Sequence, residues 1–255
     1  MNPLVSIIVT TYNRMNLLEE TIKSILNQSI TDFELIVIDN FSDYDFFVFI
    51  EKFNDMRIRP FQNFNNSIIS INRNYGINLA LGEFISFCDD DDIWISSKLA
   101  DQLFIMEKNP SVSICSTSFS YIGIDNIHFL KNFFISLRNF ALGLNIFPAK
   151  YIIILIPFVA TSSVILRKKI IDEIGFFSED PFLVSMEDYD FWLRIFQKEK
   201  FYFLNKKLFV YRIHNNQNSN YNFNLFFQKL KLVYNLNYYS FDILQKIIFK
   251  FKYNI

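Results

Sequence analysis

Short apolar runs alternate with segments of helical spacing over the first hundred residues. Val5 to Val9 is a β-branched run that ends in polar residues, which is typical of a buried strand leading into a loop. Apolar residues between positions 17 and 26 then recur at helical spacing. The same reasoning predicts strands at 33–38, 57–61 and 84–88, and helices at 45–53 and 68–81, the last closed by Gly82. This alternation predicts an α/β fold with a doubly wound, mostly parallel, Rossmann-like sheet.

The alternation weakens beyond residue 110. Strands are expected at 112–121, 159–166, 201–204 and 208–213, and helices at 168–174 and 188–198. We therefore expect one domain over residues 1–220, with halves at 1–110 and 111–220, and a helical tail over 221–255. From residue 222 onward the tail carries five lysines and one acid. It is either an amphipathic basic element on the inner face of a membrane, or a helical cap or oligomer contact.

Composition excludes several classes of function. Lys and Arg total 25 against 26 Asp and Glu, so the net charge of −1 gives no field that favours nucleic acid. Cys88 and Cys115 lack metal-ligand spacing and are expected to be reduced core residues of a cytoplasmic protein. The first residues lack a basic segment followed by an apolar run, so we expect no secretory signal. Pro157 interrupts the most apolar stretch, 151–166, so no transmembrane helix is predicted. Aromatic residues make up 18%, with 32 Phe, which indicates either membrane contact or a coding bias.

Polar side chains gather where the predicted strands end. Residues 11–13 follow the first strand, Asp39 and Asp43 follow the second, and the aspartates 89–92 follow the fourth. Ligands of doubly wound sheets bind beyond the carboxyl ends of the strands. Three separate loops are therefore expected to form one polar crevice.

The run of four aspartates is the strongest chemical signal in the chain. Like charges about 4 Å apart repel by about 1 kcal/mol even in water, and by more when they are partly buried. A divalent cation such as Mg²⁺ or Mn²⁺ would relieve this repulsion, because it prefers oxygen ligands and shares them with phosphates. A solvated acidic loop is the alternative interpretation.

The aspartates stand in the segment GEFISFCDDDDIW at residues 82–94. Other segments accompany it in a fixed order: VSIIVTTYNR at 5–14, ELIVID at 34–39, RNYGI at 73–77, EDYDFWLR at 187–194 and YRIH at 211–214. Together they resemble the donor-site and acceptor-site segments of family 2 glycosyltransferases, over about residues 4 to 219. The resemblance implies a GT-A fold in which residues 1–110 bind the nucleotide and residues 111–220 face the acceptor.

The resemblance also implies an activity: inverting transfer of a sugar from a nucleotide-diphosphate donor, such as a UDP-sugar, to a hydroxyl of a glycan or lipid-linked acceptor. The usual setting is cell-surface polysaccharide or lipooligosaccharide synthesis, with possible peripheral contact to the inner membrane. The implied nucleotide-sugar contacts are Thr11, Tyr12, Asn13, Asp39, Arg73, Asp89 and Asp90. Tyr12 is expected near the base, and Asp39 is expected to accept a hydrogen bond from it.

The implied metal ligands for Mn²⁺ or Mg²⁺ are Asp91 and His214. Alignment on the preceding strand gives the motif as Asp89-x-Asp91, and the frame Asp90-x-Asp92 stays open. For His214 the alternative is a surface loop histidine.

An inverting displacement needs a base for the acceptor hydroxyl and help for the departing diphosphate. The resemblance assigns the base to Asp188 and acceptor contacts to Glu187 and Trp94. Because Glu187 and Asp188 start a predicted helix, the alternative for them is a helix-capping pair.

Two departures from the family pattern concern loops. The family's D-D-G-S-x-D loop is replaced by DNFSD at 39–43, which loses one acid and a glycine, and GFFSE at 175–179 lacks the second glycine of G-G-F-D-E. Aspartyl-phosphate phosphatases need their D-x-D near the start of the domain, and nucleotidyltransferases need a glycine-rich loop after the first strand. Neither feature occurs, which leaves a degenerate, non-catalytic binding protein as the alternative to an enzyme.

Overall fold

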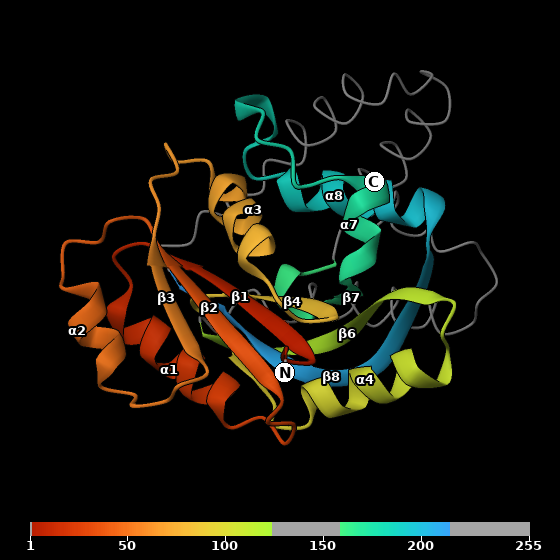
Figure 1. Cartoon of the computed structure of the whole chain (residues 1–255), viewed down its shortest axis with the longest axis horizontal. Coiled ribbons are helices and arrows are strands. Elements are labelled where there is room, and N and C mark those ends of the chain that lie inside the picture. Colours follow the sequence, from red (N-terminus) through yellow and green to blue (C-terminus); the bar gives the residue numbers. More distant parts are fainter. Residues whose placement is uncertain (1, 124–158, 215–255) are drawn as a thin grey trace, which may run out of the picture.

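The computed structural model describes residues 2–123 and 159–214. Their strands form one mixed eight-stranded sheet in the order β3-β2-β1-β4-β7-β6-β8-β5 (Figure 1). The strands are β1 (Val5–Thr11), β2 (Phe33–Asp39), β3 (Ile58–Gln62), β4 (Phe84–Asp89), β5 (Ile93–Trp94), β6 (Val112–Gly123), β7 (Ile165–Arg167) and β8 (Lys200–Ile213). The α-helices are α1 (Met15–Leu26), α2 (Phe46–Glu51), α3 (Ile69–Leu79), α4 (Lys98–Lys108), α7 (Ile171–Ile174) and α8 (Glu187–Lys198). Short 3-10 turns cover Thr161–Ser163, Lys168–Ile170 and Pro181–Leu183.

The amino-terminal half of the sheet is parallel, as predicted. β1 pairs with β2 on one side and with β4 on the other, and β3 pairs with β2. Every residue of β1 and β2 is buried, which is why both strands read as continuous apolar runs. Their carboxyl ends are in register, since Thr11 lies opposite Asp39 and Asp39 opposite Gln62.

Helices cover both faces of the sheet. Val5, Ile7 and Val9 of β1 pack into a core formed with α1, α2 and α4, whereas Ile8 packs into a second core formed with α3, α7 and α8. The two groups of helices lie on opposite sides of the sheet in Figure 1. This arrangement confirms the doubly wound α/β prediction for the part of the chain that is described.

The second half of the sheet is mixed, which the sequence pattern does not predict. β7 is antiparallel to both β4 and β6, β8 is parallel to β6, and β5 is antiparallel to β8. The two strands expected at 201–204 and 208–213 are one strand, because the exposed residues 205–207 interrupt its apolar pattern while its pairing with β6 continues through register shifts. The strand expected at 159–166 is reduced to β7 after a 3-10 turn.

Two further details correct the sequence reading. Gly82 does not end α3, whose C-cap is Ala80. A Cβ atom on Gly82 would lie 2.6 Å from the backbone nitrogen of Ser6, so this glycine permits close approach to β1. The hydrophobic pattern also misses α4, because two of its buried positions are the polar residues Lys98 and Gln102.

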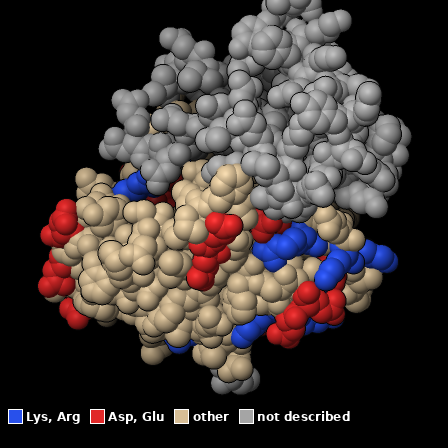
Figure 2. Space-filling model, turned by 90° about the horizontal axis from the view of Figure 1, so that it is seen from above, with Lys and Arg blue, Asp and Glu red and all other residues tan. Residues whose placement is uncertain are grey.

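Both cysteines are free and buried, as predicted. In residues 2–123 and 159–214, no helix has the length and apolar character needed to cross a membrane. Figure 2 shows acidic and basic side chains interspersed on the described part of one face, without a large patch of a single sign. The predicted tail, from residue 221 onward, lies outside the described residues.

Candidate active site

The carboxyl ends of β1, β2 and β4 bring the predicted donor residues to one edge of the sheet. The hydroxyl of Thr11 donates to Oδ2 of Asp90 at 2.8 Å, which joins the end of β1 to the turn after β4. The carbonyl of Thr11 accepts from the amide of Asn40 at 3.0 Å, which joins β1 to the loop after β2. The three loops therefore meet as the sequence predicts.

The four aspartates differ in exposure and in partners. Asp89, the last residue of β4, is partly exposed, whereas the next three are buried. Asp92 is only 1% exposed, and its Oδ1 accepts from the backbone amide of Arg212 at 3.3 Å. Asp92 therefore ties the aspartate turn to β8.

Arginine side chains neutralise much of the aspartate run. Nη1 of Arg14 lies 2.8 Å from Oδ1 of Asp90 and 3.1 Å from Oδ2 of Asp91. Nη2 of Arg73 lies 3.0 Å from Oδ1 of Asp89. Repulsion among the carboxylates therefore does not by itself require a metal. The sequence analysis assigns no role to Arg14. Its position directly after the loop at residues 11–13 could have indicated one, because a cation there would face the acidic crevice.

His214 and Asp91 converge across the site. His214 follows β8, and its Nε2 lies 3.0 Å from Oδ2 of Asp91. The guanidinium of Arg212 fixes the neighbouring backbone, because its Nε donates to the carbonyl of Asp91 at 3.1 Å. Within the described ranges, no three His, Cys, Asp or Glu side chains converge on one point. The chain thus brings together the two predicted metal ligands.

Burial shifts the pKa values of the central carboxyls. The pKa of Asp90 is raised to about 6, chiefly by burial and also by the charge of Asp91, against the opposing charge of Arg14. The pKa of Asp91 is also raised, first by burial and then by the charge of Asp89, while its hydrogen bond to His214 acts in the opposite direction. The edge of the sheet is therefore a partly desolvated site in which charges interact strongly.

Arg73 joins the two halves of the site. It is buried on α3, and its Nη1 donates to Oε1 of Glu187 at 2.9 Å while its Nη2 reaches Asp89. Burial alone would lower the pKa of Arg73, but the charges of Asp89 and Glu187 raise it above its ordinary value. A fixed guanidinium therefore connects the end of β4 with the first turn of α8.

Asp188 stands beside this connection. Its pKa is raised to about 7, chiefly by burial and then by the charge of Glu187, while Arg73 lowers it. Its Oδ1 accepts from the amide of Tyr189 at 2.7 Å. The N-cap of α8 is Met186, so neither Glu187 nor Asp188 occupies the N-cap position itself. A carboxyl that titrates near neutrality suits proton transfer.

Asp39, a predicted nucleotide contact, forms hydrogen bonds within the loop after β2 in this structure. Asp39 is fully buried, and its oxygens accept from the amide and hydroxyl of Ser42 and from Nε2 of Gln62 at 3.0 Å. The carboxylate of Asp39 therefore fixes the loop in this structure. Asn13, predicted as a donor contact, also binds this loop: its backbone amide donates to Oγ of Ser42 at 2.8 Å and its Nδ2 to Asp43 at 2.8 Å.

Two predicted contacts differ sharply in accessibility. Tyr12 is 53% exposed at the end of β1, where a ligand could reach its ring. Trp94 is only 3% exposed, and Nζ of Lys98 lies 3.8 Å from the centroid of its ring. The structure therefore places Trp94 in the core beneath the site and not among the accessible side chains.

The sequence model of the family described as Glycosyl transferase family 2 matches residues 6–175. The matched span covers both the aspartate run and the buried arginine of α3. The chain belongs to this family. Membership accounts for the order of the motifs and for their convergence at the carboxyl edge of the sheet.

Two curated relatives are similar over most of the chain. An uncharacterised glycosyltransferase of Methanocaldococcus jannaschii is 31% identical over 221 residues, which cover 85% of this chain and 73% of the relative. The Escherichia coli UDP-Glc:alpha-D-GlcNAc-diphosphoundecaprenol beta-1,3-glucosyltransferase WfaP is 30% identical over 198 residues, which cover 76% of this chain and 71% of the relative.

Solved structures of glycosyltransferases share the fold. Residues 1–349 of S. aureus TarS, in complex with UDP-GlcNAc, match with a TM-score of 0.71 at 19% identity, over 90% of this chain and 65% of that one. A Pyrobaculum calidifontis mannosyltransferase in complex with GDP-Man and Mn²⁺ matches with a TM-score of 0.64 at 18% identity, over 85% of this chain and 59% of that one. The family 2 chain thus spans somewhat less than two thirds of these solved chains, and its fold is the GT-A fold.

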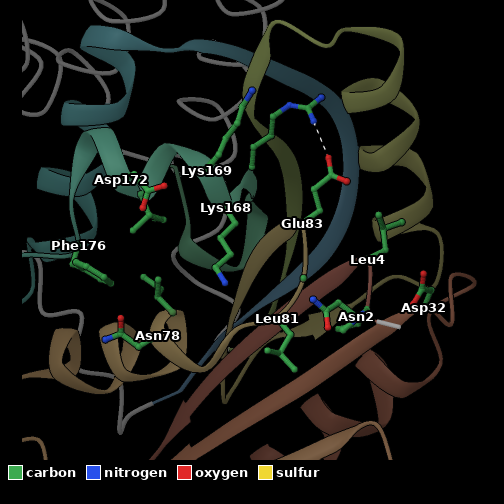
Figure 3. Close-up of a pocket in the computed structure, with 15 residues that line it drawn as sticks. Asn2, Leu4, Asp32, Asn78, Leu81, Glu83, Lys168, Lys169, Asp172 and Phe176 are labelled. Carbon is green, nitrogen blue, oxygen red and sulfur yellow. Dashed lines mark hydrogen bonds and ion pairs between the residues drawn. The ribbon is translucent and has the colours of Figure 1, made fainter.

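A separate pocket lies at the other end of the parallel strands, where β1, β2 and β4 begin. Its volume is about 830 Å³, and none of the predicted site residues lines it. Figure 3 shows Glu83, Lys168 and Lys169 around it, and an ion pair of 3.3 Å joins Glu83 to Arg167. Its lining carries acidic and basic residues alike, so it does not select a charge.

Proposed function

We propose that this chain transfers a sugar, with inversion, from a nucleotide-diphosphate donor such as a UDP-sugar to a hydroxyl of a glycan or lipid-linked acceptor. The observation that carries the proposal is the buried Arg73, which holds the donor-side Asp89 beside the pair Glu187 and Asp188. A proton acceptor thus stands next to the proposed donor site. The name of the E. coli relative specifies UDP-Glc as donor and a diphosphoundecaprenol-linked acceptor.

The donor side would be formed by the ends of β1 and β4. The exposed ring of Tyr12 offers a face to the base, and Thr11 and Asp90 fix the adjoining backbone through their mutual hydrogen bond. The partly exposed Asp89 is the carboxylate that a ribose or sugar hydroxyl could reach. Asp39 and Asn13 would act through the shape of the loop after β2, since their polar groups are engaged within it.

A divalent cation would fit the pair Asp91 and His214. A carboxylate oxygen and an imidazole nitrogen 3.0 Å apart offer two ligands of the types that Mn²⁺ accepts, and the Asp89-x-Asp91 frame is favoured because Asp92 is engaged by β8. When bound, Mn²⁺ or Mg²⁺ would supply positive charge to the departing diphosphate. Arg14 already places a guanidinium beside both Asp90 and Asp91, so it would share this task.

The displacement requires one proton acceptor, and we assign this role to Asp188. The acceptor oxygen would form the new bond to the anomeric carbon on the face opposite the nucleotide, as the bond to the diphosphate breaks and the hydroxyl proton moves to the carboxylate of Asp188. Its pKa of about 7 matches the demand on a general base near neutral pH. In the part of the chain that is described, Oε2 of Glu187 is buried without a hydrogen-bond partner, so it is suited to accept from a substrate hydroxyl.

We place the reaction on the cytoplasmic side, in peripheral contact with the inner face of the cell membrane, and in the synthesis of surface polysaccharide or lipooligosaccharide. The support comes from two relatives: the names of the E. coli glucosyltransferase and of a Campylobacter jejuni glucosyltransferase both specify undecaprenol-linked acceptors. A lipid carrier holds such acceptors at a membrane surface. The basic tail, proposed as the contact, lies outside the described residues.

The proposal can be tested with a panel of nucleotide sugars. Purified protein is incubated with each donor and Mn²⁺, and release of the nucleoside diphosphate is measured with and without synthetic polyprenyl-diphosphate sugars. We expect one donor to be turned over, with the anomeric configuration of the product inverted by NMR. Absence of binding and turnover for every donor would overturn the enzymatic proposal and leave a non-catalytic binding protein.

A further inference from the structure

Phe41 has a backbone conformation that its side chain disfavours. It follows β2 by two residues and has a φ of 57°, in the left-handed region that glycine adopts without penalty. The family's D-D-G-S-x-D loop has glycine in this region, whereas this chain carries a bulky aromatic residue. A left-handed Phe is an outlier that persists only where the surroundings impose it, and such outliers concentrate at ligand-binding sites.

Hydrogen bonds on both sides of Phe41 impose this conformation. On one side, the amide of Asn40 donates to the carbonyl of Thr11 at 3.0 Å. On the other, the amide of Ser42 donates to Oδ2 of Asp39 at 2.9 Å, and the hydroxyl of Ser42 donates to Oδ1 of Asp39 at 2.5 Å. The strand end and the buried carboxylate thus fix the loop before any ligand binds.

The ring of Phe41 contributes little to the core. It is 54% exposed, whereas Phe46 and Phe49, a few residues further on, are buried against the sheet. Among the described residues, it makes no contact with another aromatic ring. Burial therefore does not explain why a strained position carries Phe, and a ligand that covers the ring would.

Tyr12 presents a second exposed ring at the same edge. β1 and β2 are adjacent and parallel, and Thr11 lies opposite Asp39 at their ends. Tyr12 comes directly after Thr11 and Phe41 comes two residues after Asp39, so both residues lie at adjacent strand ends on the same edge of the sheet. Both rings are about half exposed, and the aspartate turn lies beyond the next strand on the other side of β1.

We propose that Phe41 and Tyr12 together form the face on which the nucleobase of the donor stacks. This inference rests on the proposed function and deepens it, by naming the residue that replaces the loop glycine as a determinant of affinity for the nucleoside. Aromatic rings bind the π-face of a base without reading its hydrogen-bonding edge. The ring of Phe41 therefore strengthens binding of the nucleoside and leaves binding of the diphosphate unchanged.

The decisive variant is Phe41→Gly, since glycine accepts the observed φ and keeps the loop. Dissociation constants are measured by titration calorimetry for UDP, uridine and inorganic diphosphate with the full chain. We expect the Kd for UDP and uridine to rise about five- to tenfold, with diphosphate binding unchanged and a melting temperature that is equal or higher. Phe41→Tyr keeps a ring and should bind as the parent does.

Phe104→Ala is the matched control. Phe104 is 58% exposed on α4, away from the ends of β1 and β2, so its removal deletes an exposed Phe outside the proposed face. The control should leave the Kd for UDP unchanged. An equal loss in Phe104→Ala would overturn the assignment to Phe41.

The remaining outcomes separate the two proposals. A folded Phe41→Gly protein that binds UDP as the parent does, with transfer intact, overturns the stacking proposal and leaves the proposed function standing. A rise in the KM for the acceptor with an unchanged Kd for UDP would assign the ring to the acceptor and also overturn it. A parent protein that binds neither nucleotide nor nucleotide sugar overturns the proposed function itself.

Discussion

Replacement of Asp188 by Asn tests the proposed base, because the amide has nearly the same shape as the carboxylate but cannot accept the proton. The hydrogen bond that Oδ1 accepts from the amide of Tyr189 can be retained by the amide oxygen, so the start of α8 should persist. A positioned general base contributes about 10² to 10⁴ in rate, which corresponds to about 2.7 to 5.4 kcal/mol at 1.36 kcal/mol per decade. We expect kcat to fall by that factor in Asp188→Asn, with the Kd for the donor nearly unchanged.

The pH profile gives an independent measure of the same group. The base must be deprotonated to act, and its pKa is about 7, so log kcat should rise with unit slope below pH 7 and level off above it. At pH 6 about 9% of the carboxyl is ionised, against about 50% at pH 7. Burial of the carboxyl is the first cause of this shift, with Glu187 second, so the profile reports the environment at the start of α8.

The assay is the release of nucleoside diphosphate under saturating donor and acceptor, from pH 5 to 9. Glu173→Gln, an exposed acid on α7, is the control and should keep both the rate and the profile. If Asp188→Asn transfers sugar at the parental rate, the assignment of the base is wrong. A parental profile that is flat between pH 5.5 and 8 would refute the argument from burial.

Three further perturbations test the described geometry. Arg14→Met removes the cation that faces the buried Asp90. At pH 8, where the carboxyl is ionised, the free energy of unfolding measured in urea titrations should fall by about 1 to 3 kcal/mol. Unchanged stability would show that the ion pair does not stabilise the fold. His214→Ala should raise the Mn²⁺ concentration needed for half-maximal transfer about tenfold or more, with metal-free UDP binding unchanged by calorimetry; an unaltered Mn²⁺ dependence would exclude this ligand. Burial lowers the pKa of Lys98 from 10.5 to about 7, so between these pH values the unfolded state holds a proton that the folded state has released. The free energy of unfolding should therefore rise with pH from about 7 to 10.5, and Lys98→Met should flatten this rise. Equal slopes in the parent and the variant would show that Lys98 is not the group responsible.

Much of the amino-terminal half could be predicted from sequence, because the apolar runs there indicate both where the strands lie and where the site residues begin. Strands buried on both faces read as apolar runs, and each run ends where the chain meets the site, so Thr11 and Asp39 could be located together. Parallel pairing then guarantees that these ends meet. The convergence of Asp91 with His214 depended instead on family resemblance, since no local pattern links residues 123 positions apart.

What could not be predicted depends on side-chain environments that sequence spacing does not encode. α4 escaped prediction because the buried Lys98 and Gln102 satisfy each other, with Nζ and Oε1 2.8 Å apart, inside the core. Trp94 seemed suited to contact a ligand, yet its ring is buried under the site. The role of Arg14 follows only from distances, because its partners lie 76 and 77 positions away.

The position of β5 has a consequence for synthesis of the chain. β5 follows the aspartate turn directly, yet among the described strands it pairs only with β8, and the backbone amide of Arg212 in β8 binds Asp92 across 120 positions. In a growing polypeptide Thr11, Arg14 and Arg73 can hold the aspartate turn early, but its bond to Arg212 waits until β8 has been made, about 6 to 24 s later at about 5 to 20 residues per second. The parallel half can assemble on the ribosome well before that moment. Catalytic competence would thus be acquired late, in one step, when the last strand closes over the acidic turn.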